Sequence, residues 1–376
     1  MAGRWGCEAA NYEKLSDLGS GTYGVVVLAK AKDREEYFAI KRIKRIVGEE
    51  PDIPRDAVRE IAVMRACSHE NVMPLLDAFV SRKNKCVHLV MPMMQSDLTL
   101  ILEKNILLTG PQMRNYAAQI LRGLDAMHSL GFVHRDLKPG NILVKFDPLT
   151  RKSTLVLTDF GLCRTVPLDP RTKPMSPQAV TVWYRPPELL FAAWAYSFAV
   201  DLWSFGCVFA EILTSKALFP GNTELDVLSR IIDLRGSPSE KVWPGYSSLP
   251  GCLGEPANPI PARPLSKVFP SVGADALSLL DQLLSYNPAA RGSAADILRK
   301  HKYFNSPEGM CKDEELPVPP LYGPVQKLFE EKGLIVPEEE DEKLTESEIR
   351  ARAASALDYA NFKDIVLAKF EAPTPK

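Results

Sequence analysis

Several side chains in a short central span have the chemistry that phosphoryl transfer requires. Residues 134–141 read His-Arg-Asp-Leu-Lys-Pro-Gly-Asn, and an Asp-Phe-Gly triplet begins at Asp159. The reaction needs a carboxylate that takes the proton of the attacking hydroxyl group, and Asp136 could supply it. Oxygen atoms of Asn141 and Asp159 would suit Mg²⁺, which prefers oxygen ligands. The spacing therefore predicts a phosphoryl-transfer site around residues 134–141.

The same residues resemble the protein kinases. The catalytic-loop pattern H-R-D-L-x-x-x-N is matched at every fixed position, and the D-F-G triplet is intact. A charged surface loop could match one of these motifs by chance, but both occur in order with other kinase motifs at family spacing. The resemblance covers residues 12–304 and implies an α+β, bilobal kinase fold. We expect a small β-rich N-lobe with one key helix over about 12–92, and a larger, mainly helical C-lobe over about 95–304.

Length and composition agree with a two-lobed globular protein that carries an appendage. The chain has 376 residues, of which 45% are hydrophobic and 25% charged, and its net charge of −1 gives no reason to expect a nucleic-acid or membrane partner. The seven cysteines form no C-x-x-C pair, which favours a reducing compartment over a disulfide framework or a zinc site. No apolar stretch is long enough to span a membrane. We expect a protein of the cytoplasm, the nucleus or both.

A glycine-rich stretch would position the phosphates of a nucleotide. Residues 18–26 fit G-x-G-x-x-G-x-V, a pattern that also resembles a dinucleotide-binding fingerprint. The dinucleotide fold requires a helix directly after the glycines, whereas a strand-like run of valines follows here, which favours the kinase hairpin. By the resemblance, the ATP-binding residues would be Leu18, Gly19, Gly21, Gly24, Val26, Ala39, Lys41, Met91, Met94 and Asp97.

The resemblance also implies roles for four catalytic residues. Lys41 ends a strand in the A-I-K form and would contact the α- and β-phosphates, with Glu60 as its partner. Asp136 would take or orient the hydroxyl proton, and Lys138 would neutralise charge on the γ-phosphate. Lys41 also opens a basic run over residues 41–45, which could instead be read as a nuclear-import signal.

A helix is predicted over residues 54–67, with an apolar stripe at Ala57, Val58, Ile61 and Met64. Its Pro-x-x-x-x-Arg-Glu-Ile frame resembles the cyclin-contacting helix of the cyclin-dependent kinases, although the middle residues differ. The resemblance therefore implies a cyclin-type activator. The alternative is a core helix with an ordinary internal salt bridge.

A last strand of the small lobe is predicted over residues 87–93, followed by the hinge. By resemblance, Met91 would close the rear of the adenine pocket. Pro92 lacks an N–H group but keeps its carbonyl, so the adenine edge could still be recognised. Asp97 would approach the ribose or the substrate backbone, or would cap a helix.

Another helix would deliver the catalytic loop. Thr109 and Gln112 form a capping box at its start, and Gly131 stands where its C-terminal cap is expected. Asp201 would bind backbone N–H groups of the loop, and His134 is more plausible as a structural histidine than as a base.

The segment over residues 159–188 is expected to be a switch, and by the resemblance Glu188 at its end would pair with Arg291. Ser176, which precedes a proline, falls where the cyclin-dependent family carries its activating phosphothreonine. The arginines that would receive the phosphate are Arg59, Arg135 and Arg164. An unmodified loop serine is the alternative.

Val180, Thr181 and Arg185 match the substrate-proline pocket of the cyclin-dependent, mitogen-activated and related kinases. Proline fits because it lacks the N–H group that would otherwise need a partner. This predicts protein substrates with Ser/Thr-Pro sites. The absence of a Thr-x-Tyr sequence argues against a mitogen-activated kinase, and the catalytic loop lacks the tyrosine-kinase signature.

The sequence does not decide which branch of the cyclin-dependent kinases the chain resembles most. Thr22 and Tyr23 match positions where cell-cycle members take inhibitory phosphates, or they are polar residues at a solvated hairpin tip. Residues 75–79 and 188–191 favour the branch that activates other cyclin-dependent kinases.

The ends of the chain lie outside the kinase pattern. Residues 1–11 resemble a disordered lead, and residues 305–376 form a C-terminal extension. The extension contains a proline-rich linker over 317–320, an acidic run over 337–342 and a helix over about 345–370. That helix could dock on the kinase or bind a partner.

Together these observations predict an ATP- and Mg²⁺-dependent protein Ser/Thr kinase, proline-directed and similar to the cyclin-dependent kinases. The alternatives are a catalytically silent kinase-fold scaffold that acts by binding, and a cyclin-independent kinase of the same broad group.

Overall fold

The computed structural model describes residues 11–21, 24–33, 35–43, 54–81, 86–165, 182–193, 197–252 and 254–334. Several predictions from the sequence lie outside these ranges: Thr22, Tyr23, Ser176, Val180, Thr181, nearly all of the N-terminal lead, and the acidic run and helix after residue 334.

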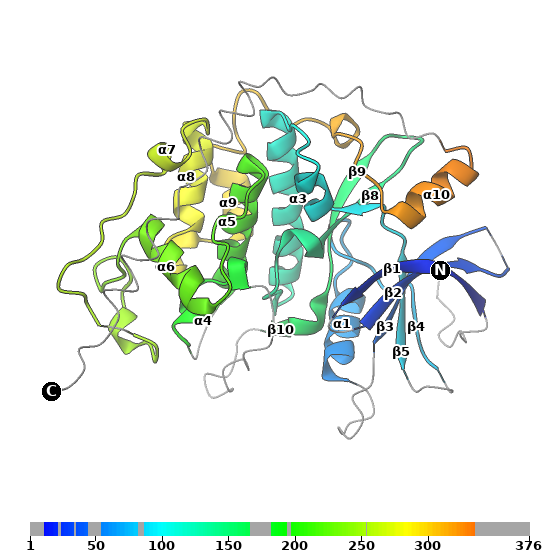
Figure 1. The fold of residues 1–376 in the computed structure, drawn as a ribbon, viewed down its shortest axis with the longest axis horizontal. Helices are drawn as coiled ribbons and strands as arrows, with labels where there is room; N and C mark the ends of the chain where they lie inside the picture. The colour runs from blue at the N-terminus through cyan, green and yellow to red at the C-terminus, as the bar shows by residue number, and fades with distance from the viewer. Residues whose placement is uncertain are drawn as a thin grey trace.

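The smaller lobe is a five-stranded antiparallel sheet with one helix beside it (Figure 1), which confirms the predicted bilobal fold. The strand order is β1-β2-β3-β5-β4, so the hinge strand β5 lies inside the sheet. The elements are β1 (Tyr12–Gly21), β2 (Gly24–Ala31), β3 (Tyr37–Ile43), α1 (Arg55–Ala66), β4 (Asp77–Val80) and β5 (Val87–Pro92). Gly24 must be glycine, because a Cβ atom there would lie 2.1 Å from the carbonyl oxygen of Arg42.

Helix α1 lies where it was predicted, but the predicted buried face is partly wrong. Ala57 and Met64 are buried as expected, whereas Val58 is 52% exposed and Ile61 is only half-buried. The helix instead turns Glu60 into the interior, toward the sheet. The spacing of apolar residues by itself predicted the wrong orientation of the helix about its axis, because the charged residue Glu60 occupies the buried face.

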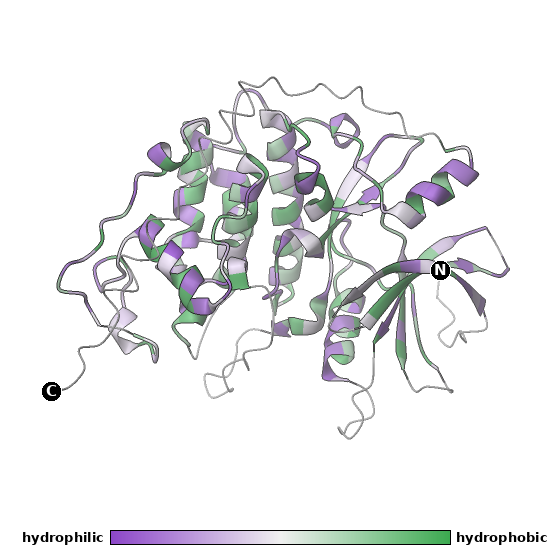
Figure 2. Ribbon diagram, in the orientation of Figure 1, coloured by the Kyte–Doolittle hydropathy of each residue, from purple (hydrophilic) through white to green (hydrophobic). Residues whose placement is uncertain are grey.

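The larger lobe is built around two long helices, α3 (Gly110–Ser129) and α5 (Ala199–Thr214), and hydrophobic residues dominate α5 in Figure 2. The capping box of Thr109 and Gln112 is confirmed, and Gly131 follows α3 with a positive φ of 81°. The other elements of this lobe are α2 (Leu98–Glu103), α4 (Pro187–Leu190), α6 (Glu224–Arg235), α7 (Leu265–Val268), α8 (Ala274–Leu283), α9 (Ala294–Lys300), β6 (Ser96–Asp97), β7 (Phe132–Val133), β8 (Ile142–Phe146), β9 (Ser153–Leu157) and β10 (Arg164–Thr165). In the part of the chain that the structure describes, no helix has the length and hydrophobicity to cross a membrane.

Residues 305–334 pack on both lobes, which the sequence analysis did not anticipate. Within the predicted linker, Val318 is buried. The chain then forms α10 (Gly323–Glu331), which lies against β1 (Figure 1). Val325, Leu328 and Phe329 are its buried residues, at the spacing of one helical face.

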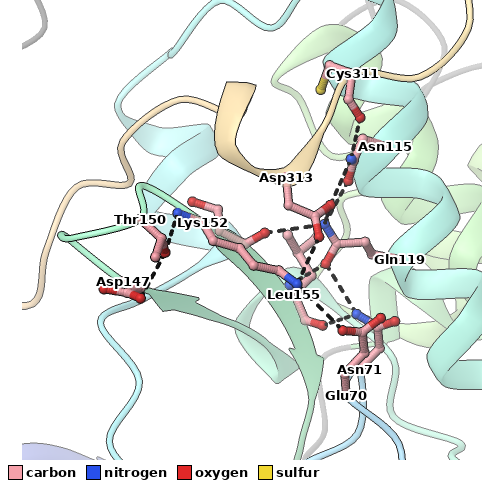
Figure 3. A network of polar contacts seen from close by, with 11 residues as sticks. Glu70, Asn71, Asn115, Gln119, Asp147, Thr150, Lys152, Leu155, Cys311 and Asp313 are labelled. Carbon is pink, nitrogen blue, oxygen red and sulfur yellow. Dashed lines mark hydrogen bonds and ion pairs between the residues drawn. The ribbon is translucent and has the colours of Figure 1, made fainter.

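Figure 3 shows the polar network that anchors the start of this segment to the larger lobe. The Asp313 carboxylate accepts hydrogen bonds from Asn115 at 3.0 Å and from Gln119 at 3.2 Å, and it lies 3.3 Å from the Lys152 ammonium group. Gln119 in turn accepts from the Leu155 N–H group at 2.7 Å. Helix α3, strand β9 and the C-terminal segment are therefore joined through one buried amide.

A buried ion pair holds α4 to the end of the larger lobe, as predicted for Glu188 and Arg291. The Arg291 guanidinium is fully buried, donates to both Glu188 carboxylate oxygens at 2.6 and 2.9 Å, and packs over the Trp203 ring. Removing one partner would leave the other charge buried without compensation.

We therefore expect Glu188→Ala to lower the free energy of unfolding by about 3–5 kcal/mol, the usual cost of breaking a buried ion pair. Urea denaturation followed by circular dichroism would measure it. Arg299→Ala is the matched control, because Arg299 pairs with Asp296 on the surface, where such pairs contribute about 0–1 kcal/mol. Equal effects of the two variants would contradict this assignment.

Candidate active site

The catalytic loop brings two of the predicted residues, Lys138 and Asn141, to the carboxylate of a third, Asp136. The Lys138 ammonium nitrogen lies 2.8 Å from Asp136 Oδ2. The Asn141 amide group donates to Asp136 Oδ2 at 2.9 Å and to the Asp136 carbonyl oxygen at 2.7 Å. Asp136 is thus held in one orientation, as a residue that receives a proton at a defined position must be.

A second aspartate supports the loop from beneath. Asp201 is fully buried and accepts hydrogen bonds from the His134 and Arg135 N–H groups, both at 2.8 Å, while His128 Nε2 lies 2.8 Å from it. Arg135 has a φ of 73°, a left-handed conformation that costs a non-glycine residue about 1–2 kcal/mol. The predicted contact of Asp201 with backbone N–H groups is confirmed, and it stabilises this strained turn.

The charge on Asp201 is maintained by its partners. Burial by itself would raise the pKa of Asp201, but hydrogen bonds from His128 and from the backbone outweigh it and hold that pKa below the ordinary value of 3.8. The carboxylate therefore stays ionised at neutral pH.

His134 has a structural place, as the sequence suggested. It is fully buried, its Nδ1 accepts from the Asp136 N–H group at 3.3 Å, and its Nε2 lies 3.0 Å from the Thr158 carbonyl oxygen. Both ring nitrogens are engaged by the backbone, so the ring links the catalytic loop to the strand that ends before Asp159.

Lys41 joins three separate elements. Its ammonium nitrogen lies 2.8 and 3.0 Å from the Glu60 carboxylate oxygens and 2.8 Å from Asp159 Oδ1. Burial would lower the pKa of Lys41, but the charges of Glu60 and Asp159 raise it above its ordinary value. Strand β3, helix α1 and the Asp-Phe-Gly triplet therefore meet at a lysine that stays positively charged.

Asn141 and Asp159 fit a magnesium site by their chemistry. Asn141 directs its amide nitrogen toward Asp136, which leaves the amide oxygen on the opposite side. Asp159 contributes a carboxylate, and within the described part of the chain Lys41 contacts its Oδ1 atom. Mg²⁺ is commonly held by one or two such protein oxygens together with phosphate groups and water. When bound there, it would neutralise charge on the phosphates.

Several of the residues predicted to bind ATP lie on neighbouring strands. In the sheet register Val26 pairs with Lys41, and Ala39 pairs with Met91. Ala39, Met91 and Met94 are buried. The structure therefore brings together residues from β2, β3 and β5 at the hinge, while their role in nucleotide binding stays a prediction.

Asp97 caps helix α2, one of the two alternatives that the sequence left open. Its Oδ1 accepts from the Leu100 N–H group at 2.9 Å. Its Oδ2 accepts from the Tyr322 hydroxyl group at 2.7 Å, a contact that no sequence pattern indicated. The proposed approach to the ribose is compatible with this position and is not tested by it.

The three arginines predicted to receive the phosphate come from elements that meet beside the catalytic loop. Arg59 donates to the Gly161 carbonyl oxygen at 3.2 Å, and β10 pairs Arg164 with Val133, two residues before Arg135. Burial lowers the pKa of Arg59, and the nearby positive charge of Arg164 lowers it further. A bound anion, such as a phosphate group, would offset the repulsion between these positive charges.

Arg185, predicted for the substrate-proline pocket, forms an ion pair with Glu224 at the start of α6. The neighbouring Trp183 indole donates to the Gly221 carbonyl oxygen at 2.7 Å. These contacts fix the end of the segment over residues 159–188 on the larger lobe.

Comparisons with known proteins agree with this geometry. The model of the protein kinase domain matches residues 12–304, so the chain belongs to the protein kinase family. The chain is 40% identical over 302 residues to cyclin-dependent kinase 7 of Xenopus laevis, covering 80% of this chain and 83% of that protein. It is 39% identical over 313 residues to cyclin-dependent kinase 7 of Dictyostelium discoideum, covering 82% and 83%.

A solved structure is similar as well. A chain in the CAK complex of Chaetomium thermophilum bound to ATP-γ-S matches with a TM-score of 0.72 and 33% identity, over 82% of this chain and 95% of that chain. Within the family, the protein is therefore a serine/threonine kinase of the cyclin-dependent type.

We expect Asp201→Asn to lower the free energy of unfolding by about 1.5–3 kcal/mol at neutral pH, because it weakens hydrogen bonds to a buried charge. The pKa of Asp201 is lowered in the folded protein, so its stabilisation is present above pH 3.8 and is lost as the pH falls below that value. Urea denaturation between pH 3 and 8 should show the difference from wild type shrinking only at the acidic end.

Asp281→Asn is the control, because Asp281 pairs with Arg235 at the surface. A constant difference between wild type and Asp201→Asn down to the lowest pH would contradict the role of the ionised carboxylate.

Proposed function

We propose that this kinase transfers the γ-phosphoryl group of ATP, with Mg²⁺, to serine or threonine residues that precede proline. The observation that carries the proposal is the assembled set of charges around Lys41 and Asp136. A scaffold that acts only by binding does not require Lys41 between two carboxylates. It also does not require an Asp136 carboxylate that is held by Lys138 and Asn141. We therefore favour catalysis over the silent scaffold.

Each residue has a distinct task in the proposed reaction. Asp136 accepts the proton of the substrate hydroxyl group, and Lys138 offsets charge on the transferred group. Lys41 contacts the α- and β-phosphates, and Glu60 keeps its ammonium group in place. Asn141 and Asp159 supply the oxygen ligands for Mg²⁺.

A cyclin-type activator is part of the proposal. Helix α1 presents Val58, 52% exposed, on the face opposite the buried Glu60. An exposed apolar residue on the helix that holds Glu60 gives a partner a direct means to control the Lys41 ion pair. Similarity to cyclin-dependent kinase 7 and to a chain of the CAK complex supports the same inference.

The proposed switch is phosphorylation of Ser176. A phosphate adds about −1.5 to −2 charge at pH 7. The positive charges of Arg59 and Arg164 that crowd each other beside the loop support such a role. A phosphate between them would order the segment that presents the substrate.

We place the kinase in the cytoplasm, the nucleus or both. In support, the six cysteines within the described ranges are free rather than paired in disulfides, as is usual in reducing compartments.

The first test is phosphate transfer from ATP–Mg²⁺ to a Ser/Thr peptide library. We expect transfer to Ser-Pro and Thr-Pro peptides by the chain together with a cyclin-type partner, and at least about 100-fold less by Asp136→Asn, in line with the contribution of a positioned base. Transfer by the chain alone would remove the partner requirement. No transfer in any condition would favour the scaffold.

The second test concerns Ser176. Phosphatase treatment of the active complex should reduce the activity of wild type and leave Ser176→Ala at the same low activity as before treatment. If phosphatase lowers both proteins equally, or neither, the switch lies elsewhere.

A further inference from the structure

The C-terminal segment crosses the hinge at Tyr322. The Tyr322 N–H group donates to the Gln95 carbonyl oxygen at 3.0 Å, and its hydroxyl group donates to Asp97 Oδ2 at 2.7 Å. Gln95 is itself fixed, because its side chain accepts from the Phe146 N–H group at 2.7 Å. Tyr322 is therefore attached to the hinge through both its backbone and its side chain.

The Asp97 carboxylate is consequently held from two sides. The Leu100 N–H group holds Oδ1, and the Tyr322 hydroxyl group holds Oδ2. Each carboxylate oxygen can accept more than one hydrogen bond, so this arrangement fixes the carboxylate without exhausting its capacity to accept. Burial and the charge of Asp97 raise the pKa of Tyr322, so the phenol stays protonated as a donor.

The hydrophobic cluster around the helix that follows Tyr322 contacts Leu18, a predicted ATP-binding residue, and Met93, which directly follows β5. Val325 and Phe329 of α10 form a hydrophobic cluster with Phe146 and Val318, and Leu18 and Met93 pack against this cluster. Met93 lies between the last strand of the smaller lobe and Met94, another predicted ATP-binding residue. The C-terminal segment is therefore in contact with Leu18 of β1, with Met93 after β5 and with Asp97.

The segment is a fixed part of the fold rather than a removable lid. Asp313 joins it to α3 and β9 (Figure 3), and Leu316, Val325 and Phe329 are buried. At its far end, Lys332 lies 2.9 Å from Glu35 of the smaller lobe. Exposing these buried groups to admit a nucleotide would be unfavourable, because their apolar side chains would be transferred from the protein interior into water.

We propose that Tyr322 is a positioning residue of the nucleotide site, which holds the Asp97 carboxylate where it accepts a hydrogen bond from a ribose hydroxyl group of ATP. This inference rests on the proposed use of ATP and adds to it a residue from beyond the kinase motifs. It assigns to the C-terminal segment a part in recognising the ribose, as distinct from the phosphates.

The test compares Tyr322→Phe with wild type in complete complexes. The variant keeps the ring and its packing and loses only the hydroxyl group. We expect KM for ATP to rise roughly three- to tenfold, as when one hydrogen bond that orients a partner is lost, with kcat within about twofold of wild type. For whichever of 2′-deoxy-ATP and 3′-deoxy-ATP lacks the contacted hydroxyl group, KM should be the same for both proteins.

Tyr286→Phe is the matched control. Tyr286 is buried in the larger lobe, and its hydroxyl group donates to the Gly236 carbonyl oxygen at 2.8 Å. This variant also loses one phenolic hydrogen bond, so it reports any general loss of stability, and its KM for ATP should equal that of wild type.

A double-mutant cycle with Asp97→Asn tests whether Tyr322 acts through Asp97. Asparagine can still cap α2, because it is as good an N-cap residue as aspartate. We expect the effects of the two substitutions on KM for ATP to be strongly non-additive, so that Tyr322→Phe adds little once Asp97 is replaced.

The failures of the two proposals are distinguishable. If wild type uses ATP and Tyr322→Phe has the KM values of wild type for ATP and both deoxy analogues, the role of Tyr322 is wrong while the proposed function stands. Additive effects in the cycle would likewise overturn it. If wild type neither binds nor consumes ATP, both proposals are wrong.

Discussion

The contact of Lys41 with Glu60 and Asp159 is the interaction on which the rest of the site depends. The lysine side chain is only 11% exposed, and a buried charge without partners is strongly destabilising. Each of the three charges therefore requires the others. Because they come from β3, from α1 and from the Asp-Phe-Gly triplet, the ion pairs determine where the helix and the triplet lie relative to the sheet.

Asp201 has the same function for the catalytic loop. Asp201 accepts hydrogen bonds from two backbone N–H groups of the loop. These bonds stabilise the turn at Arg135, whose left-handed backbone conformation would otherwise be unfavourable. In both places a buried carboxylate with several donors defines the geometry of the residues that face the substrate. The hydrophobic cores of the two lobes stabilise the fold, whereas these buried carboxylates determine where the residues of the site lie.

Several local predictions from the sequence are confirmed by the structure. The capping box at Thr109, the Glu188–Arg291 pair and the buried His134 were all expected, because each follows from a short motif or a family pattern. The buried face of α1 was partly wrong. Hydrophobic periodicity assumes that apolar residues face inward, but the demand of Lys41 for a buried partner turned Glu60 inward and left Val58 exposed.

The sequence by itself determined the class of the protein and the residues of the catalytic loop, since these lie close together in the chain and their chemistry restricts their types and spacing. Only the tertiary structure decided that residues 305–334 belong to the folded kinase and that Tyr322 meets Asp97, which lies 225 positions earlier. The physical reason is that such a contact depends on how a whole segment packs across the hinge. Neither residue carries a local pattern that identifies the other.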